Sequence, residues 1–277
     1  IGQGPMALVY QALGWRSSML GLGVLFIILA LLMFLFISDK NNPTLEKHLD
    51  SNQTLKILPS LKLVLTNKQH WLNCLFIGML YGPTTCFGEQ WGASFLSLNQ
   101  GISIEAAGQQ TGILFIGLAI GCPIIGWVSD KLQRRLLVMR VSVCVCLLLL
   151  TLIIYGKLLG ASFILNPMLC TSMLFIYGFF NSGIVCSYAL ASEISPLNIN
   201  GIALGVTNMA SVLIGAAMIP VVGFILDKAS HGMSSSGIPV YDISSYQWAF
   251  AALPIVFIIA FGITFLQKET YCQRVVS

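Results

Sequence analysis

Charged residues are scarce in this 277-residue chain: Asp, Glu, Lys and Arg make up 9% of it, against about 25% in a typical soluble domain. Hydrophobic residues make up 56%, and the mean hydropathy is +0.86. So few charges cannot cover a surface with polar groups in water, whereas a lipid bilayer removes that requirement. The composition therefore excludes an ordinary water-soluble domain and predicts a membrane protein.

Several chemical signatures are also missing. The eight cysteines form no Cys-x-x-Cys pair, and seven of them lie in apolar segments, as small buried hydrophobes do. His48, His70 and His231 all fall in the predicted connections between apolar segments. There is no Gly-x-x-x-x-Gly-Lys-(Ser/Thr) phosphate loop and no grouping of nucleophile, base or metal ligands. We therefore predict no metal, no cofactor, no nucleic-acid partner and no enzyme activity.

Seven mostly apolar segments of about 20 residues are long enough to cross a bilayer as helices. They cover residues 17–37, 71–98, 106–128, 136–155, 167–191, 203–226 and 246–266. Membrane β-strands would alternate in polarity and be about half as long. The sequence thus predicts an all-α membrane protein. Residues 1–10 resemble the end of another apolar segment, and the chain starts without Met, so we expect an upstream part to precede it.

The distribution of basic residues predicts the orientation, because positive charge is retained on the cytoplasmic side. If the loop after the first span is cytoplasmic, eleven of the fourteen Lys and Arg residues lie on that side. The other three are Arg16, Lys157 and Lys228. The C-terminus is then cytoplasmic, and a bacterial inner membrane is the expected location.

The longest polar stretch, residues 39–70, is the best domain boundary. It separates residues 1–38 from a six-helix bundle at 71–267, which residues 268–277 follow as a tail. Within it, residues 55–65 mix leucines with Lys56 and Lys62. Two interpretations stay open: a short helix in the membrane interface, or a linker with an apolar lead-in to the next span.

One very short cytoplasmic connection carries an unusual pattern of Gly126, Asp130, Lys131, Arg134 and Arg135. Asp130 lies at a helix end, so its predicted partner is one of the three cations or the positive N-terminus of a neighbouring helix. Basic residues are common in cytoplasmic loops, which accounts for the cations. It does not account for the Gly-x-x-x-Asp that precedes them.

These five residues resemble the hallmark loop of the major facilitator superfamily, Gly-x-x-x-Asp-(Arg/Lys)-x-x-Arg-Arg. Gln133 departs from the pattern, since the family often has Gly there. Two other stretches resemble the same family. They are Gly14-Trp15-Arg16, which is similar to its helix 5–6 turn, and Glu193-x-x-Pro196-x-x-x-x-Gly201-x-x-x-Gly205, which is similar to its helix 10–11 connection.

The resemblance covers the whole chain, as the end of helix 5, helix 6 and helices 7–12. It implies the C-terminal six-helix bundle of a transporter, plus one preceding helix and the end of another. It also implies a solute cavity shared with an N-terminal half that this chain lacks. In the present chain, segments 71–98, 167–191 and 203–226 would line that cavity. The implied partners are a small-molecule substrate, the lipid bilayer and the missing half.

Glu89 is the only acidic residue well inside a predicted span, where burial of a charge costs about 2.5–3.5 kcal/mol. Helical spacing places it on a face with Gly78, Gly82, Thr85 and Gly92. Such a face either borders a cavity, where Glu89 binds substrate or a proton, or packs on another helix. Further candidates for the substrate- or proton-binding site are Thr85, Gln90, Trp91, Tyr177, Asn181, Tyr188 and Asn208.

The alternatives differ among these residues. Trp91 suits a membrane-interface anchor equally well. Tyr177, Asn181 and Tyr188 share a face by spacing, and either cavity lining or interhelical hydrogen bonding explains them. For Asn208, packing among small residues is the favoured interpretation.

The sequence therefore predicts a secondary active transporter of a small polar organic solute, coupled to protons through Glu89. We expect Asp130 to latch the cytoplasmic helix ends in one state of the cycle. An alternative is an amino-acid or dipeptide carrier that works as a uniporter. A non-transporting membrane sensor on the same fold is another, which the short tail after Leu266 disfavours.

Overall fold

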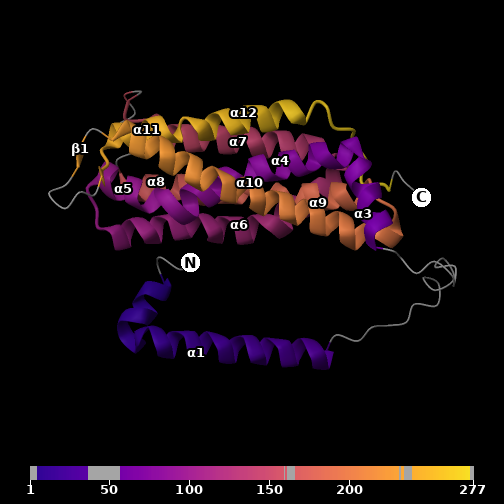
Figure 1. Cartoon of the computed structure of the whole chain (residues 1–277), viewed down its shortest axis with the longest axis horizontal. Coiled ribbons are helices and arrows are strands. Elements are labelled where there is room, and N and C mark those ends of the chain that lie inside the picture. The colour runs from indigo at the N-terminus through magenta and orange to yellow at the C-terminus, as the bar shows by residue number, and fades with distance from the viewer. Residues whose placement is uncertain are drawn as a thin grey trace.

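The computed structural model describes residues 5–36, 57–158, 160, 166–230, 232–233 and 239–274. Apart from a two-residue hairpin pairing, the regular structure is helical, which confirms the predicted all-α class. Figure 1 shows helices running side by side in one bundle, with α1 (Pro5–Phe36) lying apart from it. The bundle consists of α3 (Ile57–Thr66), α4 (Lys68–Thr84), η1 (Thr85–Trp91), α5 (Gly92–Gln100), α6 (Ile104–Leu132), α7 (Arg135–Tyr155), α8 (Pro167–Asn181), α9 (Ile184–Glu193), η3 (Leu197–Ile199), α10 (Asn200–Ala229), β1 (Gly232–Met233), β2 (Pro239–Val240), α11 (Ile243–Phe250) and α12 (Ala252–Ile263).

Six helical stretches of the described residues are long and apolar enough to cross a membrane. They are 12–36, 104–132, 135–155, 167–193, 197–229 and 243–263, and they overlap six of the seven predicted spans. The remaining predicted span, 71–98, is divided into α4, η1 and α5, because a π-helix interrupts its α-helical hydrogen bonding. The chain is thus an integral, multi-pass membrane protein.

Helix α1 bends at Gly14, whose φ of 75° and ψ of 158° are not helical. Such a positive φ suits glycine, which has no Cβ to clash with the backbone. The Ser18 hydroxyl donates to the Gly14 carbonyl at 2.8 Å and so binds a carbonyl at the bend. The bend lies where the sequence predicts a helix 5–6 turn, and nearly all described side chains after it are exposed.

The predicted linker lies partly outside the described residues, which resume at Ile57. Its second half forms the helix α3, so of the two interpretations the helical one is found. Val64 of α3 packs in a small core with Cys74 and Ala203. His70 lies in α4 and is 2% exposed, so its predicted position in a loop is wrong: Asn67 caps the helix and starts it before this residue.

Glycines set the closest helix contacts. A Cβ at Gly117 of α6 would lie 2.2 Å from the Phe175 carbonyl oxygen, and one at Gly178 of α8 would lie 1.9 Å from the Leu114 carbonyl oxygen. A side chain at either position would force the two helices apart. Close packing at Gly117 and Gly121, as predicted, is therefore confirmed.

Two other glycine predictions turn out differently within the described part of the chain. No atom lies within 4 Å of a Cβ at Gly201 or Gly205, so this pair makes no close contact inside the bundle. A Cβ at Gly126 would lie 3.6 Å from the nearest atom, on Val185, which is an ordinary van der Waals distance. Space inside this bundle therefore does not require glycine at these three positions.

Candidate functional site

The face of α4 that carries small residues packs onto α10. A Cβ at Gly78 would lie 2.3 Å from Ile214, and one at Gly82 would lie 2.7 Å from the Met218 sulfur. Thr85 continues this contact, since its hydroxyl oxygen lies 2.9 Å from the Cβ position of Gly215. The structure thus places the candidate Thr85 between two helices.

Glu89 departs from that face, because it lies in the π-helix η1, where each turn takes in an extra residue. The Gly92 N–H bonds the Phe87 carbonyl, five residues earlier, which is the π-type pattern. A π-helix rotates fewer degrees per residue than an α-helix, so the Glu89 side chain points away from the face that carries Gly78 and Gly82. Glu89 and Gln90 are both exposed on the bundle surface.

Tyr81 and Glu89 come together across this segment, with the tyrosine hydroxyl donating to the Glu89 Oε1 at 3.4 Å. Helix α9 packs beside α4, and its Tyr188 lies near Tyr81. Its hydroxyl donates to the Asn208 Oδ1 of α10 at 2.9 Å. The elements α4, η1, α9 and α10 therefore place Tyr81, Glu89, Tyr188 and Asn208 in one region, called here the polar face.

Sequence reasoning missed Tyr81. Eight positions separate it from Glu89, a spacing that leaves two residues about 80° apart around a regular α-helix. The π-turn reduces that separation. The available signal was Pro83, which lacks an N–H and so disturbs the helical hydrogen bonds just before η1.

Tyr177 and Asn181 lie elsewhere, inside the bundle at 0% exposure. The Tyr177 and Thr84 hydroxyls are 2.7 Å apart, and the Asn181 Nδ2 donates to the Leu80 carbonyl at 2.8 Å. Of the two open interpretations, these contacts favour interhelical bonding for both residues. They are separated from Tyr188 because α8 ends at Asn181 and α9 begins at Ile184, so the spacing of one continuous helix does not apply.

Trp91 lies at the end of η1, and its ring packs against the bundle core. A Cβ at Gly223 of α10 would lie 3.3 Å from the ring. Among the described residues, the buried Nε1 of Trp91 has no hydrogen-bond partner. Buried indole N–H groups usually have one, so Trp91 is an exception among the described residues.

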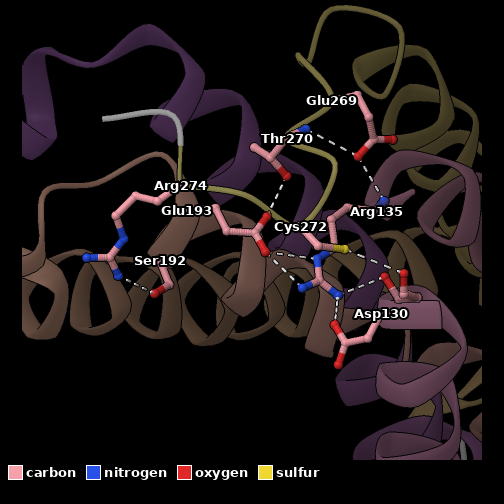
Figure 2. Close-up of polar contacts among 9 residues, drawn as sticks. Asp130, Arg135, Ser192, Glu193, Glu269, Thr270, Cys272 and Arg274 are labelled. Carbon is pink, nitrogen blue, oxygen red and sulfur yellow. Dashed lines mark hydrogen bonds and ion pairs between the residues drawn. The ribbon is translucent and has the colours of Figure 1, made fainter. Parts of the chain in front are cut away.

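A second polar site lies at the end of the bundle that holds the C-terminus, and Figure 2 shows its contacts. Arg135 lies at its centre, with a side chain 8% exposed. Its Nη1 is 2.5 Å from the Asp130 Oδ1, and its Nη2 is 2.8 Å from the Glu193 Oε1. The same Nη1 donates to the Ser129 hydroxyl at 3.0 Å. Arg135 is therefore the cation that pairs with Asp130.

The other two cations of the loop make different contacts. The Lys131 Nζ lies 4.9 Å from the centre of the Trp127 ring, which is a cation–π distance. Arg134 is exposed and precedes α7 in an extended conformation. The structure thus separates three basic residues that their proximity in sequence had left equivalent.

The tail after α12 joins this network, which sequence reasoning did not predict. Glu269 accepts hydrogen bonds from the backbone N–H groups of Arg135 and Leu136 at 2.8 and 2.9 Å. It thereby caps the positive N-terminus of α7. Thr270 donates a hydrogen bond to the second carboxylate oxygen of Glu193. The Cys272 sulfur lies 3.6 Å from the Ser129 carbonyl oxygen, and burial raises the pKa of this thiol. We call Ser129, Asp130, Arg135, Glu193, Glu269 and Thr270 the ion network.

The backbone conformation of Gln133 explains why the family often has Gly at this position. It ends α6 with a φ of 51°, in the left-handed region that favours glycine. We expect Gln133→Gly to stabilise the protein by about 1 kcal/mol, because glycine avoids the steric cost of that conformation. The thermal midpoint in detergent should then rise by roughly 2–4 °C.

Gln133→Ala is the matched control for this prediction, because it removes the side chain but keeps the Cβ. It should leave the midpoint near that of the parent. An equal rise in both variants would attribute the effect to loss of the glutamine side chain and contradict the conformational explanation.

Comparisons with known proteins identify a family and two relatives that this chain is similar to. A family model described as Major Facilitator Superfamily matches residues 2–220. The D-galactonate transporter of Escherichia coli is 29% identical over 145 residues, which cover 51% of this chain and 33% of that protein. The hexose-6-phosphate:phosphate antiporter of Salmonella typhimurium is 28% identical over 211 residues, which cover 75% and 42%. The matches thus span less than half the length of these curated relatives.

Proposed function

Because the chain belongs to the Major Facilitator Superfamily, we propose that it forms the C-terminal half of a secondary active transporter for a small polar organic solute. The polar face carries this proposal. It is exposed on membrane-spanning segments, where a carboxyl group in contact with lipid would be costly. A water-filled cavity shared with a second six-helix bundle removes that cost. The exposed side chains of α1 are consistent with a helix that packs on such a bundle or on lipid.

The chemistry of the polar face bears on the substrate class. It offers one carboxyl group, two phenols and an amide. In 68–100, 167–193 and 200–229, the only cations are Lys68 and Lys228, both near helix ends. The two relatives are named for a sugar acid and a sugar phosphate. Such an anion would need cations from the other bundle, so this half by itself favours a neutral, zwitterionic or cationic solute.

Coupling to protons through Glu89 is part of the proposal. In this proposal its carboxyl group faces the cavity, where it accepts a hydrogen bond from Tyr81. The ion network is proposed to lie on the cytoplasmic side of a bacterial inner membrane. There Asp130 would latch helix ends, because its side chain is 65% exposed and remains accessible to a second bundle.

Transport in proteoliposomes tests this function. We expect the complete transporter to accumulate a labelled solute against its concentration gradient when an inward proton gradient is imposed. A panel of sugars, amino acids, short peptides and sugar acids identifies the substrate class. Addition of a protonophore should collapse the accumulation. Accumulation that persists with the protonophore would contradict proton coupling, and a complete absence of exchange across the panel would contradict transport of these solutes.

A further inference from the structure

Helix α3 has more apolar surface exposed than a short helix in water would normally carry. Ser60 and Val64 are its buried residues. Ile57 and Leu58 are 72% and 78% exposed, and Leu63 is 53% exposed. A helix with large exposed apolar side chains beside a membrane-spanning bundle has two available partners, lipid and protein.

The arrangement of residues around α3 favours lipid. Leu58 and Leu65 are seven residues apart and lie two turns along the same edge. Lys62 is placed between them, so its apolar stem can lie over the leucines while its ammonium group reaches outward. Thr66 lies next to Lys62 around the helix and roughly 80–100° from Leu58 and Leu65, so these two residues form a more polar edge beside the apolar one.

Trp71 supplies a second observation at the same place. It is 48% exposed, and its indole Nε1 donates to the Leu65 carbonyl at the end of α3, at 2.7 Å. Tryptophan with a paired N–H and an exposed ring is typical of the boundary between lipid and water. The end of α3 is therefore held beside a side chain suited to that depth.

The charge around α3 is positive. Lys62, Lys68 and Lys268 are exposed. The Lys268 backbone N–H donates to the Gln69 side chain at 2.9 Å, which brings the tail beside the start of α4. Residues 57–71 contain no Asp or Glu. Figure 1 shows α3 at the end of the bundle that holds the C-terminus, where the sequence predicts the cytoplasmic side.

We propose that α3 lies in the bilayer interface, with Leu58 and Leu65 at the acyl boundary and Lys62, Lys68 and Lys268 facing anionic lipid headgroups. Basic residues near an anionic membrane surface attract it within about a Debye length. The assignment to the cytoplasmic leaflet rests on the proposed orientation. The contact between α3 and lipid does not depend on that orientation, so it can be tested separately from transport.

Spin labels test the contact. Single cysteines replace Leu58 or Thr66 after the native cysteines have been exchanged, and each labelled protein is placed in nanodiscs of phosphatidylcholine. We expect the label at Leu58 to be several-fold more accessible to oxygen, which concentrates in lipid, than to a water-soluble nickel chelate. The label at Thr66, the matched control, should show the reverse preference.

Both other outcomes at Leu58 overturn the proposal. Accessibility like that at Thr66 would place this edge in water. Low accessibility to both reagents would mean that protein covers it, which would assign the surface to a second bundle.

The headgroup contact has its own test. Adding a minority of phosphatidylglycerol should move the Leu58 label deeper, and Lys62→Gln/Lys68→Gln should abolish that shift. An unchanged depth in the parent, or the same shift in the variant, would remove the anionic lipid from the proposal.

Discussion

Glu89→Gln should abolish uphill accumulation driven by a proton gradient while solute exchange at equal pH survives. Glutamine resembles the neutral, protonated carboxyl group in shape and polarity, but it cannot release a proton. The variant therefore retains one protonation state of the cycle and loses the other. In proteoliposomes, the internal solute should stop at the external concentration, whereas exchange of labelled for unlabelled solute should continue at a rate near that of the parent.

The environment of Glu89 is the reason for expecting so selective an effect. Among the described spans it is the only acidic residue far from a helix end. It lies in a π-helix, a segment type that is often found at functional sites and that turns it toward the polar face. Its carboxyl group accepts a hydrogen bond from the Tyr81 hydroxyl and is exposed on the face of the bundle that is proposed to line the cavity. On the proposed alternating cavity, such a carboxyl group can take up a proton on one side of the membrane and release it on the other.

Glu105→Gln is the matched control for this experiment. Glu105 is exposed in the first turn of α6, away from the polar face, and its loss should leave accumulation unchanged. Persistent accumulation in Glu89→Gln would exclude Glu89 as the coupling site. Loss of exchange and binding together, with an unchanged thermal midpoint, would instead assign Glu89 to the solute.

The membrane spans could be predicted from the sequence because their apolar length alone requires a helix, whatever packs beside it. The break in 71–98 could not, since a π-helix changes the hydrogen-bond register without changing hydropathy. That change moved Glu89 from a face shared with Gly82 and Thr85 to one shared with Tyr81. The same limit applies to Tyr188, where a break after Asn181 invalidated a spacing argument.

The ion network shows a different limit. Asp130 and Arg135 could be singled out because they belong to a short local pattern, which left three cations and a helix N-terminus open as partners of Asp130. Glu269 contacts the start of α7 across 134 residues of chain, and no local pattern specifies such a contact. Only the fold brings the tail back to the loop.

Arg135→Met should lower the free energy of unfolding by about 3 kcal/mol, because it leaves the buried Glu193 without its cation. The Glu193 side chain is 12% exposed, so water cannot replace the lost partner well. In detergent, the thermal midpoint should fall by roughly 6–12 °C. Asp130→Asn removes the other ion pair of Arg135 and should cost less than about 1 kcal/mol, since the Asp130 side chain is 65% exposed.

A double substitution separates an ion-pair effect from simple loss of packing. Replacement of both buried partners by apolar residues of similar size is often close to neutral, because neither charge is then left unpaired. Arg135→Met/Glu193→Met should therefore be more stable than Arg135→Met alone. If the double variant is less stable than either single one, the pair does not explain the loss. If Asp130→Asn lowers the free energy of unfolding as much as Arg135→Met does, solvent exposure does not determine how much each ion pair contributes to stability.

Asp130→Asn also tests the latch, because it should change transport more than stability. If Asp130 holds helix ends together in one state of the cycle, its loss alters the rate of interconversion and leaves the solute site intact. We therefore expect a slower turnover with nearly unchanged equilibrium affinity for the solute in the complete transporter. Glu89→Gln, which alters the polar face, is predicted to have the opposite pattern, with exchange maintained and coupling lost. A collapse of affinity in Asp130→Asn at a normal turnover rate would show that the ion network does not act as a latch.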